Sequence, residues 1–114
     1  MPGDFPDGLS DVPVTIHDFT SGDTIARGRA SLCFVEHTDR LRVMRFRFSG
    51  EFTPETPEDE VALERALVSG FSAGAVGHKL QVAHGGKTWA LTVKLDLGEA
   101  VFPFTGRSDP KPIA

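Results

Sequence analysis

Several stretches of the chain carry residue types that could do chemistry, and each meets a structural objection. Residues 70–74 read Gly-Phe-Ser-Ala-Gly, the pattern of a nucleophile elbow, in which a strand enters and a helix leaves the serine. Here the preceding residues predict a helix and the following residues a strand, so the order is reversed. Cys33 and His37 lie in one predicted strand, where about 13 Å of separation prevents a hydrogen bond between them. Cys33 is therefore interpreted as a buried structural thiol.

The histidines and a glycine-rich turn give no stronger site. The four histidines, His17, His37, His78 and His84, show no spacing typical of a zinc site. His78 falls among apolar residues and is interpreted as a hydrogen-bonded core residue. Residues 85–88 read Gly-Gly-Lys-Thr, but they lack the longer loop and the helix of a phosphate-binding loop. The sequence therefore predicts no catalytic residue, no metal ligand and no cofactor, and we expect that the protein is not an enzyme.

The chemical feature with most functional promise is a set of arginines on two neighbouring predicted strands. Its members are Arg27, Arg29, Arg45 and Arg47. A guanidinium group binds phosphate or carboxylate through paired hydrogen bonds. Whether the four form one candidate binding face depends on the elements that carry them.

One amphipathic helix is predicted over residues 56–71. Thr56 suits the N-cap, Pro57 suits the first helical position, and three acidic residues follow at the positive end of the helix dipole. Gly70 and Gly74 supply a stop signal. The residues of its predicted buried stripe, spaced at three and four, are Val61, Leu63, Ala66, Leu67, Val68, Gly70 and Phe71.

Strands are predicted on both sides of this helix from alternating apolar residues. Their ranges are 12–17, 25–37, 41–53, 75–84, 87–97 and, as a short edge strand marked by Pro103, 101–104. A hairpin at Gly85-Gly86 pairs Val82 with Trp89. Residues 1–11 are predicted to form a flexible arm and residues 106–114 a flexible tail, which leaves a single α+β domain over 12–105.

The loop between the second and third strands decides which residues share a face. A two-residue loop at 39–40 would pair Phe34 with Arg45. A three-residue loop at 38–40 pairs Phe34 with Met44 and Ala30 with Phe48, and it buries one apolar face cleanly. We therefore predict the three-residue loop, which gathers the four arginines on the outer face and turns Phe34 inward.

The order of elements resembles that of the OB-fold, a small antiparallel β-barrel. The resemblance is topological, covers residues 12–97 and carries no sequence motif, and an open α+β roll has the same order. It implies a ligand surface on the second and third strands and on two loops, here residues 20–23 and 85–87, which adds Lys87 to the candidate face. Single-strand binders also need outward aromatic side chains for base stacking, and the predicted register leaves none on these strands.

Length and composition limit the function classes. A chain of 114 residues predicts one domain, and a net charge of −4 argues against bulk attraction to nucleic acid or an anionic membrane. One cysteine, no signal-peptide pattern and no long apolar run predict a cytoplasmic protein without membrane contact. The preferred hypothesis is a small non-enzymatic binding module that acts through protein–protein contacts and self-associates. The alternatives are single-stranded nucleic-acid binding through the arginine face, and a small-ligand carrier or enzyme that uses the barrel interior.

Overall fold

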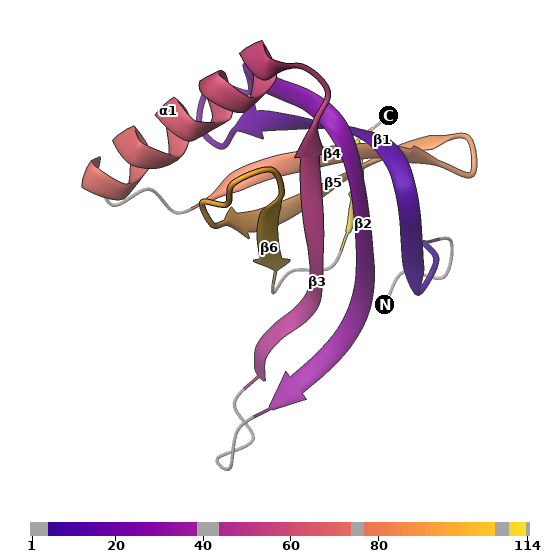
Figure 1. The fold of residues 1–114 in the computed structure, drawn as a ribbon. Coiled ribbons are helices and arrows are strands. Elements are labelled where there is room, and N and C mark those ends of the chain that lie inside the picture. The colour runs from indigo at the N-terminus through magenta and orange to yellow at the C-terminus, as the bar shows by residue number, and fades with distance from the viewer. Residues whose placement is uncertain (1–4, 39–43, 74–76, 107–109, 114) are drawn as a thin grey trace.

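Alternating apolar residues form strands on both sides of the single helix that the described residues contain. The computed structural model describes residues 5–38, 44–73, 77–106 and 110–113, with side chains undescribed at 35–38, 44–47 and 69–73. The elements in Figure 1 are β1 (Gly8–Asp18), β2 (Thr24–Thr38), β3 (Met44–Pro54), α1 (Pro57–Ala73), β4 (His78–His84), β5 (Lys87–Leu95), β6 (Phe102–Gly106) and β7 (Lys111–Pro112).

Six of these strands close into an antiparallel barrel. β1, β2 and β3 are consecutive neighbours, as are β4, β5 and β6, and the pairs β1–β4 and β3–β6 join the two units on both sides. β7 adds a short pairing to β5. The predicted α+β barrel and its order of elements are confirmed, and closure on both sides distinguishes it from an open roll. The OB-like topology is not confirmed, because an OB barrel has five strands.

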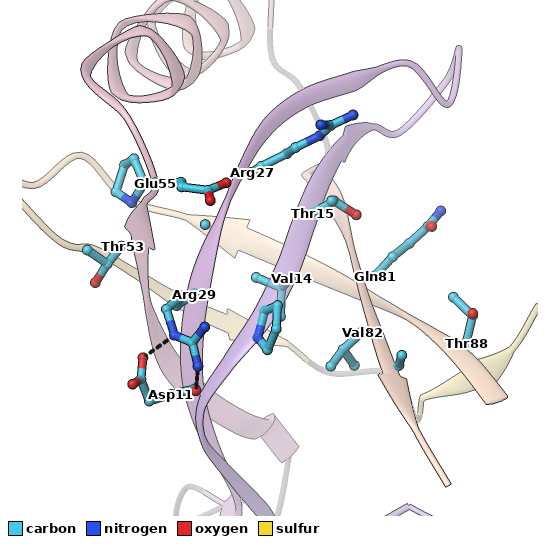
Figure 2. Close-up of a pocket in the computed structure, with 14 residues that line it drawn as sticks. Asp11, Val14, Thr15, Arg27, Arg29, Thr53, Glu55, Gln81, Val82 and Thr88 are labelled. Atoms are coloured by element: carbon cyan, nitrogen blue, oxygen red, sulfur yellow. Dashed lines mark hydrogen bonds and ion pairs between the residues drawn. The ribbon is translucent and has the colours of Figure 1, made fainter. Parts of the chain in front are cut away.

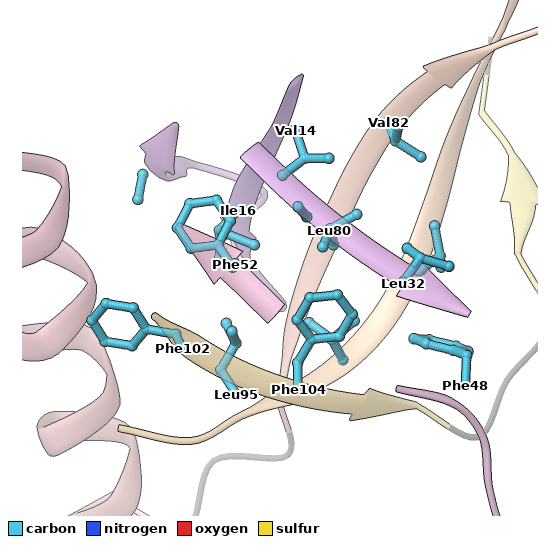
Figure 3. Close-up of a cluster of buried hydrophobic side chains, with 14 of the residues drawn as sticks. Val14, Ile16, Leu32, Phe48, Phe52, Leu80, Val82, Leu95, Phe102 and Phe104 are labelled. Carbon is cyan, nitrogen blue, oxygen red and sulfur yellow. The ribbon is translucent and has the colours of Figure 1, made fainter. Parts of the chain in front are cut away.

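Aromatic and aliphatic side chains fill the barrel interior (Figure 3). Alternate residues of each strand point inward, as the period of two requires. The largest of these fully buried side chains are Trp89, Phe48, Phe52, Phe102 and Phe104. Each large apolar side chain removed from water contributes about 1.5–3 kcal/mol, so closure of the barrel is favoured mainly by this interior.

Two glycines make room for phenylalanine rings inside the barrel. Gly106 pairs with Phe48 and Gly50 pairs with Phe104 across neighbouring strands. A Cβ atom at Gly106 would overlap the Phe48 ring, and one at Gly50 would lie 2.7 Å from the Phe104 ring. The large rings of β3 and β6 therefore depend on a missing side chain on the opposite strand.

Helix α1 begins as the sequence predicts. The Thr56 hydroxyl accepts a hydrogen bond from the Asp59 N–H at 3.2 Å and donates one to the Asp59 carboxylate at 2.7 Å. Leu63 is fully buried, but Val61 and Val68 are 46% and 57% exposed, so their predicted place on the buried stripe is wrong. The described contacts of α1 are with β2 and β3, so the helix covers the barrel with a narrower stripe than predicted.

The predicted register of β2 and β3 is wrong by four residues. Phe34 pairs with Phe48 rather than Met44, and Ala30 pairs with Phe52 rather than Phe48. Thr38 and Met44 are still paired, so the connection between the strands covers 39–43, which lies outside the described residues. A shift by an even number keeps every side chain on its face, so the predicted inward face is retained.

Both ends of the chain depart from the predicted flexible segments. β1 begins at Gly8 rather than at 12, and Phe5 is only 3% exposed. The Phe5 ring packs edge-on against the rings of Phe34 and Trp89, with centroid distances of 5.7 and 5.2 Å. At the other end β7 pairs with β5 and Pro110 is buried. Residues 1–4, 107–109 and 114 of the two predicted segments lie outside the described residues.

β6 is an interior strand, so its prediction as an edge is wrong. It pairs with β3 along its whole length and with β5 through Phe104 and Thr105. The carbonyl of Pro103 accepts a hydrogen bond from the Asp96 N–H at 2.8 Å. Because the N and C=O of a strand residue face the same side, the ring nitrogen of Pro103 faces β5 just beyond the end of that ladder. The missing N–H of Pro103 therefore removes no hydrogen bond from the β5–β6 pairing.

β2 and β3 continue past the barrel as a two-stranded ribbon (Figure 1). β1 pairs with β2 as far as Cys33, and β6 pairs with β3 over residues 48–52, whereas β2 and β3 remain paired to Thr38 and Met44. Residues 35–38 and 44–47, here named the β2–β3 ribbon, therefore have no further strand beside them among the described residues. Within the described part of the chain, the outer backbone edges of this ribbon are paired with no other strand.

Candidate functional site

An open groove of about 600 Å³ crosses the outer face of β1, β2 and β4 (Figure 2). We call it the β2 groove. It collects outward residues from neighbouring strands because β1 lies between β2 and β4 in the sheet. The polar residues that line it are Asp11, Thr15, Arg27, Arg29, Thr53, Glu55, Gln81 and Thr88.

Arg29 is held by an acid of the neighbouring strand. Its Nε donates to the Asp11 carboxylate at 2.7 Å, and a second guanidinium nitrogen donates to the Asp11 carbonyl (Figure 2). Asp11 adopts a positive φ of 49° at an irregularity in the β1–β2 ladder, and its N–H donates to the Ser31 hydroxyl. These contacts stabilise a backbone conformation that is uncommon for aspartate. The pair is solvent-exposed, so its net contribution to stability is small.

Arg27 lies two residues before Arg29 on the same face of β2. Its backbone is fixed at both ends, because its N–H donates to Asp59 at 3.1 Å and its C=O accepts from the Glu55 N–H at 2.9 Å. Asp59 has a lowered pKa, mainly because the Thr56 hydroxyl donates to its carboxylate. The Arg27 guanidinium forms no ion pair with the described residues, and it is exposed in the groove.

The structure does not bring the four predicted arginines together. Arg29 pairs with Thr53 in the observed register, six residues along β3 from Arg47, which corresponds to about 20 Å of strand. Arg45 and Arg47 belong to the β2–β3 ribbon, and their side chains lie outside the described residues. Of the predicted face, the described residues show Arg27 and Arg29 side by side in the groove.

Lys87, the fifth member of the predicted face, lies beside the groove and is not part of its lining. It opens β5 after the Gly85-Gly86 turn, and its amino group lies 5.8 Å from the centroid of the Trp89 ring. Its neighbour Thr88 lines the groove. Lys87 is therefore near the groove in sequence but is oriented by an aromatic contact.

Phe34 faces the core, as predicted. Its ring packs against Phe48 at a centroid distance of 5.5 Å and against Phe5. The outward positions of β2 over the barrel hold Arg27, Arg29, Ser31 and Cys33, and none of these is aromatic. The described part of this face therefore lacks the stacking side chains of a single-strand binder.

Cys33 is exposed, so its interpretation as a buried structural thiol is wrong. It points outward because Leu32 and Phe34, on either side of it in β2, point to the core. Cys33, Ser49 and Glu51 are among the residues that line a second concavity on β2 and β3. The described residues give this thiol no histidine partner, since the side chain of His37 lies outside them.

The serine motif and two of the histidines, His78 and His17, lie within regular elements of the fold. Residues 70–73 of the serine motif are the last turn of α1, so a helix does enter the motif. His78 is buried on β4 as predicted, and burial lowers its pKa while the nearby Asp18 carboxylate raises it. His17 is also buried and hydrogen-bonds to Thr15 at 2.7 Å. The described residues contain no cluster of histidine, cysteine and acidic side chains placed to hold a metal ion.

Sequence reasoning missed Asp11, Thr15 and Gln81 as groove residues. Asp11 lies in the predicted flexible arm, where the alternation changes phase between Leu9 and Val12, so the pattern gives no signal for its outward position. Thr15 alternates with Val14 and Ile16, so its outward direction was available from the pattern. Gln81 reaches the groove through the pairing of β1 with β4, which joins distant segments and leaves no local signal.

No helix among the described residues is both long enough and apolar enough to cross a membrane. Comparison of the chain with protein-family models, curated proteins and solved structures gives no match. Function must therefore be argued from the groove, the ribbon and the packed interior.

Proposed function

We propose that this protein is a small non-enzymatic binding module that acts through protein–protein contacts and self-associates through the β2–β3 ribbon. The observation that carries the proposal is the ribbon's position beyond the last residues that β1 and β6 pair with. Open strand edges present backbone N–H and C=O groups that a further strand can pair with. Strand addition is a common way for a β-rich module to bind a protein.

The sequence of the ribbon supports this use. Residues 44–47 alternate apolar and basic types, Met-Arg-Phe-Arg, which is the pattern of a strand with one apolar face. A bare two-stranded ribbon is marginally stable in water, and further strands stabilise it. The exposed thiol of Cys33 beside the ribbon supports a reducing compartment, so we place the module in the cytoplasm.

The two alternative functions receive less support. Nucleic-acid binding would draw on four aligned arginines and outward aromatic side chains, whereas one of the two described arginines is engaged by Asp11. A carrier or enzyme would need a polar pocket in the barrel interior. The buried side chains of the described residues are apolar apart from His17 and His78.

The test is the oligomeric state of the whole chain and of a variant without the ribbon. Phe34 and Phe48 are paired, so replacing residues 35–47 by Asn-Gly joins them through a two-residue turn and leaves the barrel core intact. Light scattering after gel filtration should show a mass that rises with concentration for the natural chain and a constant monomer for the variant. The matched control, Arg27→Ser, changes the groove and should associate as the natural chain does.

Two results would contradict the proposal: a strict monomer at every concentration, or undiminished association of the ribbon-less variant. If that variant does not fold, hydrogen exchange is measured on the natural chain instead. The amide groups of residues 44–47 should then exchange more slowly at high than at low protein concentration, because strand addition would protect them.

A further inference from the structure

We propose that the β2 groove is a binding site for an extended acidic peptide segment, with Arg27 holding one carboxylate of that segment. The proposal goes beyond self-association, because the groove and the β2–β3 ribbon share no residue. It rests on the contrast between two arginines of one strand, on the hydroxyl and amide side chains of Thr15 and Gln81 beside them and on the length of the groove.

The two arginines present the same chemical group in different states. Arg27 and Arg29 project from one face of β2, two residues or about 6.6 Å apart. Arg29 already holds a carboxylate and a backbone carbonyl, both from Asp11. A carboxylate and a carbonyl are also what an acidic peptide offers. Asp11 therefore shows within the chain the kind of contact that Arg27 can make with a second chain.

Arg27 is positioned for this contact. Its backbone N–H and C=O are both engaged, by Asp59 and by Glu55, which fixes the point from which its side chain extends. Its guanidinium has no ion pair among the described residues, and its charge also helps to lower the pKa of the Asp59 carboxyl, so a bound carboxylate would share this attraction rather than break a pair. Glu55 also lines the groove and reduces the local positive charge. We therefore expect modest affinity that decreases as salt is added.

The remainder of the groove suits a peptide backbone. Arg27 pairs with Thr15, and Thr15 pairs with Gln81, so the three side chains form a row across β2, β1 and β4. Neighbouring strands are about 4.8 Å apart, so the row spans about 10 Å, the length of about three extended residues. Hydroxyl and amide groups at the middle of the row can donate to and accept from backbone groups. A small anion would use only the Arg27 end.

The test is a titration of the isotope-labelled chain with the hexapeptide acetyl-Thr-Glu-Val-Glu-Thr-Val-amide, followed by NMR. The amide signals of Thr15, Gln81 and Arg27 should shift, and the side-chain Nε signal of Arg27 should shift with them. Arg27→Gln should weaken binding about tenfold or more, and Arg27→Lys should weaken it less, because lysine keeps the charge but loses the paired donors. The matched control is Arg65→Gln, which removes an exposed arginine of α1 outside the groove and should leave the affinity unchanged.

The other probes separate the possible occupants. The same hexapeptide with Gln in place of Glu should bind at least about tenfold more weakly. Equal affinity for sodium acetate would overturn the peptide part of the proposal, and absence of shifts at the three groove residues would overturn all of it. Shifts at these residues that depend on protein concentration alone would identify a second copy as the occupant instead. Repeating the titration with the ribbon-less variant separates this proposal from self-association, since peptide binding should persist there.

Discussion

Phe48 and Gly106 are paired across β3 and β6, and the Phe48 ring leaves no room for a side chain at residue 106. The ring of Phe48 occupies the position where a Cβ of residue 106 would lie. The pair belongs to the β3–β6 ladder that closes the barrel, so a shift of the ring is resisted by the strands on both sides. Overfilling a packed interior in this way forces side chains away from their preferred conformations.

We therefore predict that Gly106→Ala lowers the free energy of unfolding by about 1–3 kcal/mol. Urea denaturation followed by the fluorescence of the buried Trp89 measures it. Phe48→Leu should cost less in the Gly106→Ala background than in the natural chain, because the smaller side chain relieves the overlap. Additive effects of the two substitutions would contradict this explanation.

His78 gives the barrel a defined response to pH. Its pKa lies below the ordinary value of 6.5 because burial disfavours the charged ring, an effect that the Asp18 carboxylate partly offsets. As pH falls through 6.5, the unfolded chain takes up a proton that the folded chain still refuses, so the unfolded state binds more protons. Stability should therefore decrease from neutral to mildly acidic pH.

The measurement is the free energy of unfolding across this pH range. His78→Gln should flatten the decrease, since glutamine does not titrate, whereas His84→Gln should retain it. The Asp18 carboxyl acts in a lower window. Its pKa is lowered by the N–H groups of Ser21 and Thr20, so its contribution is present above about 3.8 and is lost below that pH. An unchanged slope in His78→Gln would show that other groups govern the response.

At the scale of elements, the turns separate what the sequence could predict from what it could not. Gly85 and Gly86 both adopt positive φ, and the predicted pairing of Val82 with Trp89 is confirmed. Two glycines fix both the position and the length of that loop. Residues 39–43 contain no glycine, proline or asparagine to fix the loop, so the apolar pattern set the faces of β2 and β3 but left their register free by even steps.

The predicted arginine face depended on the register of β2 and β3, which the sequence did not determine. The predicted register placed Arg45 and Arg47 opposite the barrel part of β2, whereas the observed register moves them into the ribbon. The groove needed a further fact, the pairing of β1 with β4, which no local pattern contains. Arg27 and Arg29 could thus be singled out from the sequence, but their neighbours Asp11 and Gln81 could not.

Phe5, which lies three residues before β1, is a core residue in a segment whose composition predicts a flexible arm. Residues 1–11 are rich in proline, glycine and aspartate, which is typical of a loose arm, yet Phe5 fills a space between Phe34 and Trp89. Removing a buried aromatic ring leaves a cavity, so Phe5→Ala should lower the free energy of unfolding by about 3 kcal/mol. Phe19→Ala should cost about 1 kcal/mol or less, since that ring is 40% exposed and contacts Lys79. Equal costs would show that Phe5 does not dock in solution.

At the scale of the whole molecule, the barrel consists of two three-stranded units, β1–β3 and β4–β6, which are joined by α1 and by the β1–β4 and β3–β6 pairings, here called the two seams. Neither unit has a core of its own, because the rings that fill the barrel come from both. Phe52 of the first unit pairs with Phe102 of the second, and Ile16 pairs with Leu80 across the other seam. Each unit alone would expose an apolar sheet face to water, at a cost of about 25 cal/mol for every Å².

We therefore predict that the chain divides into two fragments that fold only together. A cut between residues 75 and 76 lies between α1, which ends at Ala73, and β4, which begins at His78, so it leaves every described strand whole. The fragment 76–114 alone should show the solvent-exposed fluorescence of Trp89, and adding the fragment 1–75 should restore the buried emission and the circular dichroism of the intact barrel. Phe52→Ala in the first fragment should weaken reassociation strongly, whereas Thr53→Ala, on the outer face of the same strand, should not. A fragment 76–114 that buries Trp89 unaided would show that the second unit folds on its own and that the seams are secondary.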